Sequence, residues 1–438
     1  MERLASLIAE FQQRSIPDLT ARDVELPVIP GMADLVVGVR RCGKTYRLYQ
    51  EMQRLRAEGV PTQRILYLNL EDDRLQPADV SLLGEAIETF YRLSPSARVD
   101  GAHLLFDEVQ AVDGWSRFLR RVLDTENARV YASGSSAKLL STEVSTEFRG
   151  RGFAVELLPF SFREVVRHAG VEVPRQLPGA RLRTRLEALF LRYLYVGGFP
   201  AVQNLAEPDL VQTLQDYVDL VLLRDIVERH RISNVAASRR FVRALLQSTG
   251  RLFTVNKTYN AFRSQGIEVG KDTLHALLAH VEDAFLAFAI PRFAASQRVR
   301  EMSPKKIYPI DPGLARAMSH ISVVDVGSRL ETAVYLELRR RLRGSREGSI
   351  SHYVTAGGRE IDFVLGVPED LAAARLVQVC ADLSVAATRE RELGALAEGM
   401  AELSVREATL ITLHTRKELE TPSGPVHVVP AWQWMLGL

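Results

Sequence analysis

Short apolar runs alternate with longer segments of helical periodicity between residues 32 and 168, and this alternation is the clearest pattern in the chain. The apolar runs predict β-strands at 34–38, 64–69, 103–107, 129–133 and 153–157, with helices between them. Strands that alternate with helices are typical of a parallel sheet covered by helices on both faces. We therefore expect an α/β core in this part of the chain.

The pattern changes outside this core, and the changes divide the chain into five expected parts. These parts are an N-terminal helix and linker at 1–30, the α/β core at 31–168, a helical region at 169–233, three helices and two apolar strands at 234–327, and a second α/β region at 328–438. Three helices followed by a β-hairpin are the elements of a winged helix. We therefore expect that fold at 234–327.

The first strand of the core leads into a glycine-rich segment with the spacing G-x-x-x-x-G-K-T at residues 38–45. In a loop of this type, backbone N–H groups surround the β-phosphate of a nucleotide and the positive end of the next helix faces the same anion. Lys44 would reach the β- and γ-phosphates, and Thr45 would ligate Mg²⁺. The residues expected to contact the nucleotide are Gly38, Arg40, Arg41, Cys42, Gly43, Lys44, Thr45 and Tyr46.

The strand at 103–107 ends in two adjacent carboxylates, Asp107 and Glu108. An apolar strand with this ending has the form of a Walker B motif, in which Asp107 holds the Mg²⁺ shell and Glu108 polarises the attacking water. For the pair alone, two solvated acids at a strand end are the alternative. Together with the phosphate-binding loop, the pair predicts hydrolysis of the nucleotide. The chain has no Asn-Lys-x-Asp guanine-reading motif, which favours ATP.

Three polar residues further along the chain are candidates for contact with the nucleotide, and each has a structural alternative. Ser135 or Ser136 follows the fourth strand, where a polar side chain can sense the γ-phosphate; alternatively, a serine here caps a helix that includes Lys138. Arg224 lies in the helical region and can supply a positive charge to the nucleotide. An ion pair between Arg224 and an aspartate of its own or a neighbouring helix is the alternative.

Arg151 is the candidate for an arginine finger, ahead of Arg149, because it lies between glycines just before the last strand of the core. An arginine finger must protrude to reach the γ-phosphate held by a neighbouring subunit. This interpretation therefore implies a homo-oligomer. A solvated arginine, or one paired with a local acid, is the alternative.

The chain has 438 residues, of which 46% are hydrophobic and 25% charged, as in ordinary globular proteins of several domains. The net charge of +2 does not by itself indicate a nucleic-acid partner, so such binding would need a local basic patch. The tip of the expected hairpin carries four cations that can contact DNA phosphates, namely Arg298, Arg300, Lys305 and Lys306. A solvated loop on a winged helix that contacts proteins is the alternative.

The two cysteines, Cys42 and Cys380, lie far apart and do not have the spacing of a zinc site or a disulfide framework. A free thiol within the phosphate-binding loop fits a reducing compartment. The sequence has no apolar stretch of about 18 residues and no basic-then-apolar leader. We therefore expect a cytoplasmic protein without a membrane segment.

Several motifs, in order along the chain, resemble one family of archaeal and bacterial P-loop ATPases. They are G-V-R-R-C-G-K-T at 38–45, F-D-E-V-Q at 106–110, S-G-S-S at 133–136, F-R-G-R at 148–151, L-P-F-S-F-R-E at 158–164, V-G-G-F-P at 196–200 and L-L-R-D-I at 222–226. The resemblance implies an AAA-type core with a helical lid, then a winged helix, and a C-terminal domain of unknown function with a restriction-endonuclease-like α/β fold.

The chain departs from the nuclease pattern that this resemblance implies. A restriction-endonuclease-like site needs an acid on its second strand and Glu-x-Lys on its third. Asp362 and Glu331 can supply acids, but the third strand has Gln378 and Cys380 at the two key positions. Gln378 has no charge for Mg²⁺ and Cys380 has no ammonium group, so we expect a degenerate domain without nuclease activity.

The sequence as a whole predicts an oligomeric AAA-type ATPase that hydrolyses Mg-ATP and couples this turnover to remodelling of DNA or translocation along it. The alternative is a nucleotide-dependent signalling or scaffold NTPase that acts on a protein partner.

Overall fold

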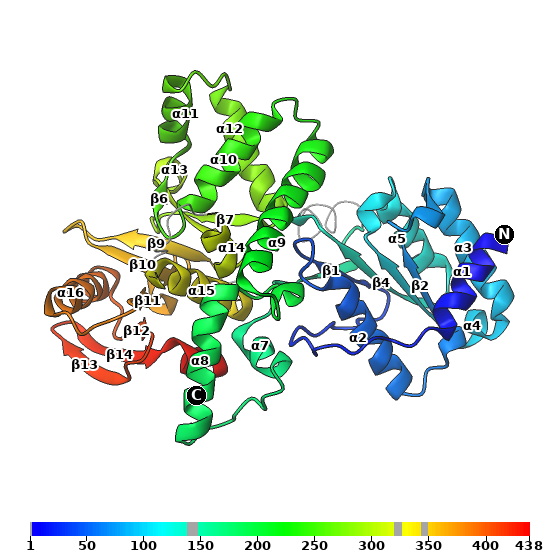
Figure 1. The fold of residues 1–438 in the computed structure, drawn as a ribbon, viewed down its shortest axis with the longest axis horizontal. Helices are drawn as coiled ribbons and strands as arrows, with labels where there is room; N and C mark the ends of the chain where they lie inside the picture. Colours follow the sequence, from blue (N-terminus) through cyan, green and yellow to red (C-terminus); the bar gives the residue numbers. More distant parts are fainter. Residues whose placement is uncertain (1, 138–147, 319–325, 343–348) are drawn as a thin grey trace. The chain divides into compact units, whose positions relative to one another are not determined.

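The computed structural model describes residues 2–137, 148–318, 326–342 and 349–438 (Figure 1). The chain forms two compact units. The first contains the residues up to Leu158 together with Asp283–Phe285, and the second contains Pro159–Glu282 and Leu286–Leu438. None of the described helices has the length and apolar character needed to cross a membrane.

The first unit is built on a five-stranded parallel sheet in the order β2-β3-β4-β1-β5. Its strands are β1 (Ala33–Val37), β2 (Ile65–Asn69), β3 (Ala102–Asp107), β4 (Ala128–Gly134) and β5 (Gly152–Glu156). Every residue of β1 and β3 is buried. Since successive side chains point to opposite faces, both faces of the sheet are covered. The five strands and the parallel sheet expected from the sequence are confirmed, each strand end to within one residue.

Among the described residues of this unit, five α-helices accompany the sheet, namely α1 (Glu2–Gln13), α2 (Lys44–Ala57), α3 (Val80–Leu93), α4 (Pro95–Asp100) and α5 (Trp115–Thr125). Helix α2 packs against β1, β3 and β4, and α5 packs against β4. Strand β4 lies between β1 and β3 in the sheet. Because the carboxyl ends of parallel strands meet at one edge, the segments that follow β1, β3 and β4 gather there.

The second unit begins with helices α7 (Phe162–His168), α8 (Ala180–Val196) and α9 (Glu207–Leu220), and α9 continues as a π-helical segment, Val221–Glu228. Next come α10 (Val235–Gln247), α11 (Val255–Ser264) and α12 (Lys271–Asp283), with an antiparallel sheet in the order β6-β8-β7. These strands are β6 (Leu252–Phe253), β7 (Ala287–Ile290) and β8 (Lys305–Pro309).

The connection between β7 and β8 differs from the loop expected at the hairpin tip. A short helix, α13 (Gln297–Met302), lies within it. The side chain of Ser296 accepts a hydrogen bond from the backbone N–H of Val299 and so caps the start of this helix. Two of the four expected tip cations lie on α13, and the other two begin β8.

A buried carboxylate, Asp311, joins two segments that lie far apart in the sequence of the second unit. It precedes α14 (Pro312–Ala317) and accepts hydrogen bonds from the N–H groups of Gly198 at 2.5 Å and Gly313 at 2.8 Å. Burial raises the pKa of Asp311 to about 6. A Cβ added to Gly197 would lie 1.9 Å from Oδ1 of Asp311, so this close approach requires glycine. The V-G-G-F-P motif therefore has a packing role.

The C-terminal part of the second unit contains a six-stranded sheet in the order β13-β14-β12-β11-β10-β9. Its elements are α15 (Val326–Arg341), β9 (Ile350–Val354), β10 (Glu360–Leu365), β11 (Arg375–Val379), α16 (Ala386–Leu403), β12 (Ala408–Thr412), β13 (Lys417–Thr421), β14 (Gly424–Pro430) and α17 (Ala431–Leu436). The core between α16 and the sheet includes Leu376, Leu396 and Leu410. Asp362 lies on β10 and Gln378 on β11, the second and third strands of this part of the chain.

Candidate functional site

The phosphate loop, residues 38–45, connects β1 to α2. Arg41 and Gly43 have left-handed backbone conformations, with φ of 67° and 103°, and Lys44 is the first residue of α2. A Cβ added to Gly38 would lie 2.1 Å from the carbonyl oxygen of Leu157. Glycine is therefore needed at position 38 for contact with the chain after β5. The loop ends at a helix N-terminus, whose free N–H groups favour an anion.

Lys44 and Glu108 form an ion pair at the end of the sheet. Their side chains are 2% and 14% exposed, and 3.2 Å separates Nζ of Lys44 from Oε1 of Glu108. Burial acts to lower the pKa of Lys44, but Glu108, Cys42 and Asp107 together outweigh it and the pKa of Lys44 is raised. Burial likewise acts to raise the pKa of Glu108, but Lys44, Gln110 and Arg40 together lower it. Both partners are therefore charged at neutral pH.

Asp107, the last residue of β3, is fully buried and is surrounded by hydroxyl groups. Its Oδ2 accepts hydrogen bonds from Oγ1 of Thr45 at 2.6 Å and from the hydroxyl of Tyr67 at 2.9 Å, and its Oδ1 accepts one from Ser133. Burial and the Glu108 carboxylate raise the pKa of Asp107, while these hydroxyl groups act to lower it. The structure thus brings Thr45 and Asp107 into contact, as the Mg²⁺ assignment requires. Hard oxygen ligands of this kind fit that ion.

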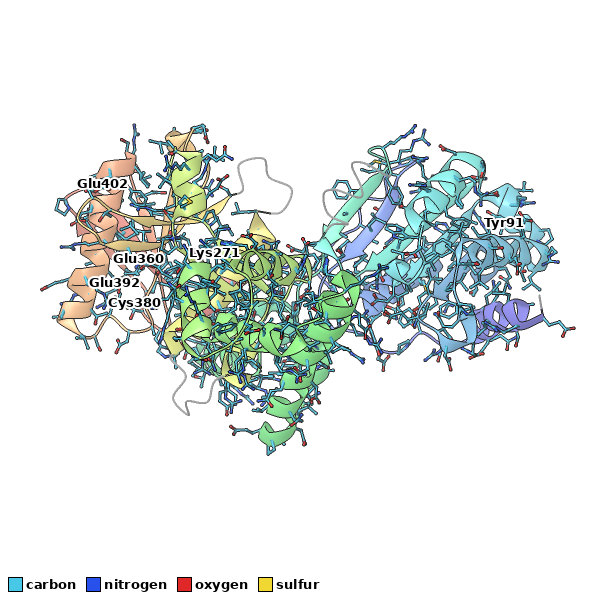
Figure 2. All side chains as sticks on the ribbon, turned by 90° about the horizontal axis from the view of Figure 1, so that it is seen from above. Tyr91, Lys271, Glu360, Cys380, Glu392 and Glu402 are labelled. Carbon is cyan, nitrogen blue, oxygen red and sulfur yellow. The ribbon has the colours of Figure 1, made fainter. Side chains whose placement is uncertain are left out.

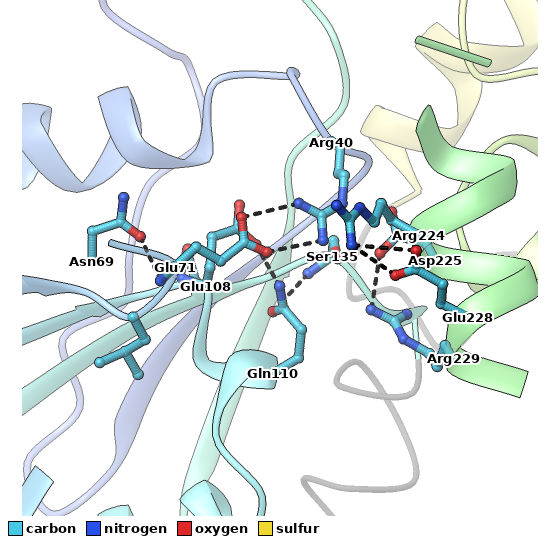
Figure 3. Close-up of polar contacts among 12 residues, drawn as sticks. Arg40, Asn69, Glu71, Glu108, Gln110, Ser135, Arg224, Asp225, Glu228 and Arg229 are labelled. Carbon is cyan, nitrogen blue, oxygen red and sulfur yellow. Dashed lines mark hydrogen bonds and ion pairs between the residues drawn. The ribbon is translucent and has the colours of Figure 1, made fainter. Parts of the chain in front are cut away.

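The cluster also contains three residues whose contacts were not predicted from the sequence, namely Tyr67, Gln110 and Ser133. Ser133 also accepts a hydrogen bond from the backbone N–H of Glu108 at 3.0 Å. Ser135, the residue chosen for γ-phosphate sensing, is buried, and its backbone N–H donates to Oε1 of Gln110 at 3.3 Å (Figure 3). Gln110 and Ser133 belong to two of the quoted motifs, and this was the available signal. The helix expected to include Lys138 lies outside the described residues.

The other residues of the phosphate loop differ in what they present to a nucleotide. Arg40 makes two hydrogen bonds with the Glu71 carboxylate, at 3.0 and 3.1 Å (Figure 3). Arg41 is exposed, and Tyr46, one turn into α2, is 48% exposed. Both side chains can therefore contact a ligand at the loop.

Cys42 is fully buried, and burial raises the pKa of its thiol. Its backbone carbonyl accepts a hydrogen bond from the guanidinium of Arg22 at 2.9 Å, and the same guanidinium donates to the carbonyl of Leu158 at 2.5 Å. Cys42 thus contributes its backbone rather than its thiol to the loop. Arg22, in the linker before β1, thus ties the loop to the chain that follows β5. This role of Arg22 was not predicted from the sequence.

The two arginines assigned to nucleotide contact are both engaged in ion pairs. Arg151 is half-exposed and pairs with Asp124, the alternative considered from the sequence. Arg224 lies in the π-helical segment of the second unit and pairs with Glu228 at 2.9 Å, a glutamate of its own helix and not the aspartate considered from the sequence (Figure 3). Both pairs are solvent-exposed, and exposed pairs contribute little free energy. The roles of Arg151 and Arg224 toward the nucleotide stay predictions.

The assignment of Lys306 to a DNA-binding tip is wrong, because its side chain is only 3% exposed. Its ammonium contacts Glu331 at 2.9 Å, Glu360 at 2.6 Å and Asp362 at 2.8 Å. These three carboxylates come from α15 and β10, and Glu360 is labelled in Figure 2. Burial and the Asp362 carboxylate raise the pKa of Glu331 to about 8. Because the ammonium of Lys306 is buried among three carboxyl groups, it does not contact a phosphate backbone.

This cluster also changes the comparison with a nuclease site. A nuclease site needs an ammonium group on the third strand, where this chain has Cys380. Here the ammonium of Lys306, on β8, contacts Asp362 and Glu331 instead. On the third strand, Gln378 accepts from the N–H of Asp362 at 3.0 Å and donates to Glu392 at 2.6 Å. The amide of Gln378 thus links the backbone of Asp362 to the carboxylate of Glu392.

Comparison with known proteins agrees with the geometry of the first unit. Residues 32–166 match the family model of the AAA domain. This part of the chain is therefore similar to an AAA domain. Residues 187–325 match a domain of unknown function. The AAA match spans the phosphate loop, Asp107 and Glu108, so these residues lie where the nucleotide site of such a domain is expected.

The relatives found by sequence carry no functional description of their own. An uncharacterized protein of Methanocaldococcus jannaschii is 29% identical over 427 residues, covering 95% of this chain and 90% of the relative. An uncharacterized protein of Haemophilus influenzae is 27% identical over 331 residues, covering 75% and 78%. Among solved structures, the ORC2 protein of Aeropyrum pernix is 11% identical, covers 66% of this chain and 87% of its own, and has a TM-score of 0.36. This TM-score does not establish a shared overall fold.

Proposed function

We propose that the first unit hydrolyses ATP and that the second unit uses this turnover to act on DNA. The observation that carries the first half of this proposal is the contact of the two motifs: Lys44 lies 3.2 Å from Glu108, and Thr45 lies 2.6 Å from Asp107. Residues 64 and 62 positions apart in the sequence thus meet at one edge of the sheet, in the part of the chain that matches the AAA domain, with the charges that phosphoryl transfer requires.

Each residue has a distinct role in this proposal. The backbone of the phosphate loop and Lys44 bind the phosphates and stabilise the negative charge that develops on them. Glu108 orients the attacking water and accepts its proton. Thr45 and Asp107 hold Mg²⁺, which when bound neutralises charge on the β- and γ-phosphate oxygens. Arg40, Arg41 and Tyr46 are the remaining side chains of the loop that are available to the nucleotide.

The DNA half of the proposal rests on exposed cations of the four helices and three strands described at 235–309, which we interpret as a winged helix. Arg298 lies on an exposed position of α13, and Lys257, Arg263 and Lys271 are exposed on α11 and α12. Such a group can neutralise DNA phosphates. We interpret the C-terminal sheet as a degenerate restriction-endonuclease-like domain, in which Lys306 balances the acids.

A nucleotide-dependent switch that acts on a protein partner is the second candidate. The burial of Lys306 favours it, since this removes one of the four cations that were assigned to DNA. The two candidates differ in one measurement, the effect of DNA on ATP turnover at low salt.

The test is ATP turnover of the full chain with and without duplex, single-stranded and forked DNA. The proposal predicts that at least one of these DNAs raises kcat, and that the salt concentration that abolishes DNA binding also abolishes the stimulation. ATP turnover that no DNA changes, with no DNA binding at low salt, would favour the protein-partner switch. Absence of ATP turnover under all conditions would contradict both candidates.

The oligomeric part of the proposal is tested through Arg151. Arg151→Ala is expected to leave ATP affinity nearly unchanged and to lower turnover, because a finger meets the phosphate only across a subunit boundary. Mixing Arg151→Ala with Lys44→Met protein should then restore part of the activity, since each variant supplies what the other lacks. Turnover that is independent of protein concentration, together with a monomeric mass, would remove the finger assignment.

A further inference from the structure

The side chain of Gln110 links the carboxylate of Glu108 to Ser135, the residue that directly follows β4. Its Nε2 donates to Oε2 of Glu108 at 2.6 Å, and its Oε1 accepts from the backbone N–H of Ser135 at 3.3 Å (Figure 3). The orientation of the amide follows from these partners, because an ionised carboxylate only accepts and a backbone N–H only donates. The same side chain therefore contacts the base of the reaction and the end of β4.

The surroundings of Glu108 explain why this contact has a functional consequence. Glu108 has a left-handed backbone conformation, with φ of 56°, and its backbone N–H donates to Ser133. Its side chain contacts Lys44 through Oε1 and Gln110 through Oε2. The phosphates of ATP attract Lys44, and an ammonium shared with phosphates holds the carboxylate less firmly. The amide of Gln110 is uncharged and has no such competing attraction.

We propose that Gln110 is a positioning residue for hydrolysis: it holds the Glu108 carboxylate in the orientation that activates water and ties this orientation to the end of β4. This inference rests on the proposed ATPase function. It adds that a change at Ser135, the assigned γ-phosphate sensor directly after β4, moves the base through the amide of Gln110. Gln110 does not itself touch the reacting atoms.

Two substitutions separate the two contacts. Gln110→Glu keeps an oxygen that accepts from Ser135 but replaces the donor facing Glu108 with an acceptor. Two facing carboxylates cannot both ionise easily, so the pKa of Glu108 rises. Gln110→Ala removes both contacts. Gln53→Glu, at an exposed position of α2, makes the same charge change away from the site and serves as the control.

The measurement is ATP affinity together with kcat as a function of pH, for the full-length protein. Both Gln110 variants should bind ATP within about threefold of wild type, and kcat at pH 7 should fall by about 10²-fold, as expected for a displaced catalytic group. Because Glu108 must be ionised to accept a proton, the acidic limb of the kcat profile should move to higher pH in Gln110→Glu and stay in place in Gln53→Glu.

The results that overturn the inference are distinct from those that overturn the proposed function. If the wild type hydrolyses ATP and Gln110→Glu has the same kcat and the same acidic limb, Gln110 does not position the base. A large loss of ATP affinity in both Gln110 variants would show a structural role for the side chain and also contradict the inference. Absence of ATP hydrolysis by the wild type would overturn the proposed function, and the inference with it.

Discussion

Each unit contains a buried lysine paired with carboxylates, but the two lysines have different surroundings. The side chain of Lys44 is 2% exposed and contacts one carboxylate, while that of Lys306 is 3% exposed and contacts three. Lys44 ends a glycine-rich loop and begins a helix, so backbone N–H groups favour an anion beside it. Lys306 lies within β8, between β6 and β7, and its charge is already balanced.

This difference shows that a buried lysine–carboxylate pair does not by itself indicate phosphate chemistry. The backbone around the lysine decides whether a phosphate can approach it. We therefore assign Lys44 to ligand binding and Lys306 to the stability of the second unit. The same substitution, lysine to methionine, tests this contrast at Lys44 and at Lys306, because it removes the charge and keeps most of the side-chain length.

The largest effect is expected on the stability of the second unit in Lys306→Met. Removing one partner of a buried ion pair leaves the others uncompensated and costs about 3–5 kcal/mol of unfolding free energy. Urea unfolding followed by tryptophan fluorescence measures it. In a Trp115→Phe background the signal comes only from Trp432 and Trp434, which both lie in the second unit.

Lys44→Met is the matched control for this loss of stability. It should lower the unfolding free energy by less than Lys306→Met does, because it leaves one carboxylate without its ammonium partner instead of three, and Glu108 keeps the hydrogen bond from Gln110. Equal losses in the two lysine variants would show that both pairs are structural and would remove the contrast.

Nucleotide affinity should show the opposite order. Lys44→Met is expected to weaken ATP binding by at least about tenfold, since a charged hydrogen bond contributes about 1.5–3 kcal/mol. Lys306→Met should bind ATP like the wild type at temperatures where its second unit is folded. Isothermal titration with a non-hydrolysable ATP analogue measures both. ATP affinity that survives in Lys44→Met would contradict the assignment of the phosphate loop.

The sequence predicted the first unit better than the second, for a physical reason. The strands of the first unit are local patterns, and the phosphate loop carries its chemistry within eight consecutive residues. Asp107 and Glu108 were likewise found from their own strand. Gln110 and Ser133 were missed because their roles depend on contacts across neighbouring strands, which the spacing along the chain does not show.

Lys306 shows the same limit more strongly. In the sequence it follows Lys305 and lies close to Arg300, so it was interpreted as one of four exposed cations. Its three partners lie 25 to 56 positions further along the chain. Only the tertiary structure reveals that β8 directs it toward α15 and β10. The charges near Lys306 in the sequence predicted an exposed side chain, whereas the structure buries it.

The stability loss in Lys306→Met should depend on pH. Glu331 has a pKa of about 8 in the folded protein, above its unfolded value of about 4.5, so its contribution is most favourable below pH 4.5 and is lost as pH rises through 8. Without the Lys306 ammonium, the cause that lowers the pKa of Glu331 is lost, so this pKa rises further and ionisation of the carboxyl cluster costs more free energy. The difference in unfolding free energy between wild type and variant should thus be larger at pH 8 than at pH 5. A difference independent of pH would show that Lys306 does not interact with ionised carboxylates.

The smallest effect is expected at α13. Arg298→Glu with Arg300→Glu should weaken DNA binding and lower the slope of log affinity against log salt by about 0.9 for each phosphate contact that is lost. The matched control is Arg175→Glu with Arg181→Glu, at exposed positions before and in α8. Equal salt slopes for the two double variants would indicate that α13 does not contact DNA.

The measurement that tests the central claim most directly is ATP hydrolysis and ATP affinity of Glu108→Gln beside the wild type. Glu108 acts on the attacking water, whereas Lys44 and the loop backbone hold the phosphates. The account predicts that the variant binds ATP within about threefold of the wild type and that its turnover falls by about 10²–10⁴-fold. Turnover at the wild-type rate in Glu108→Gln would contradict the account.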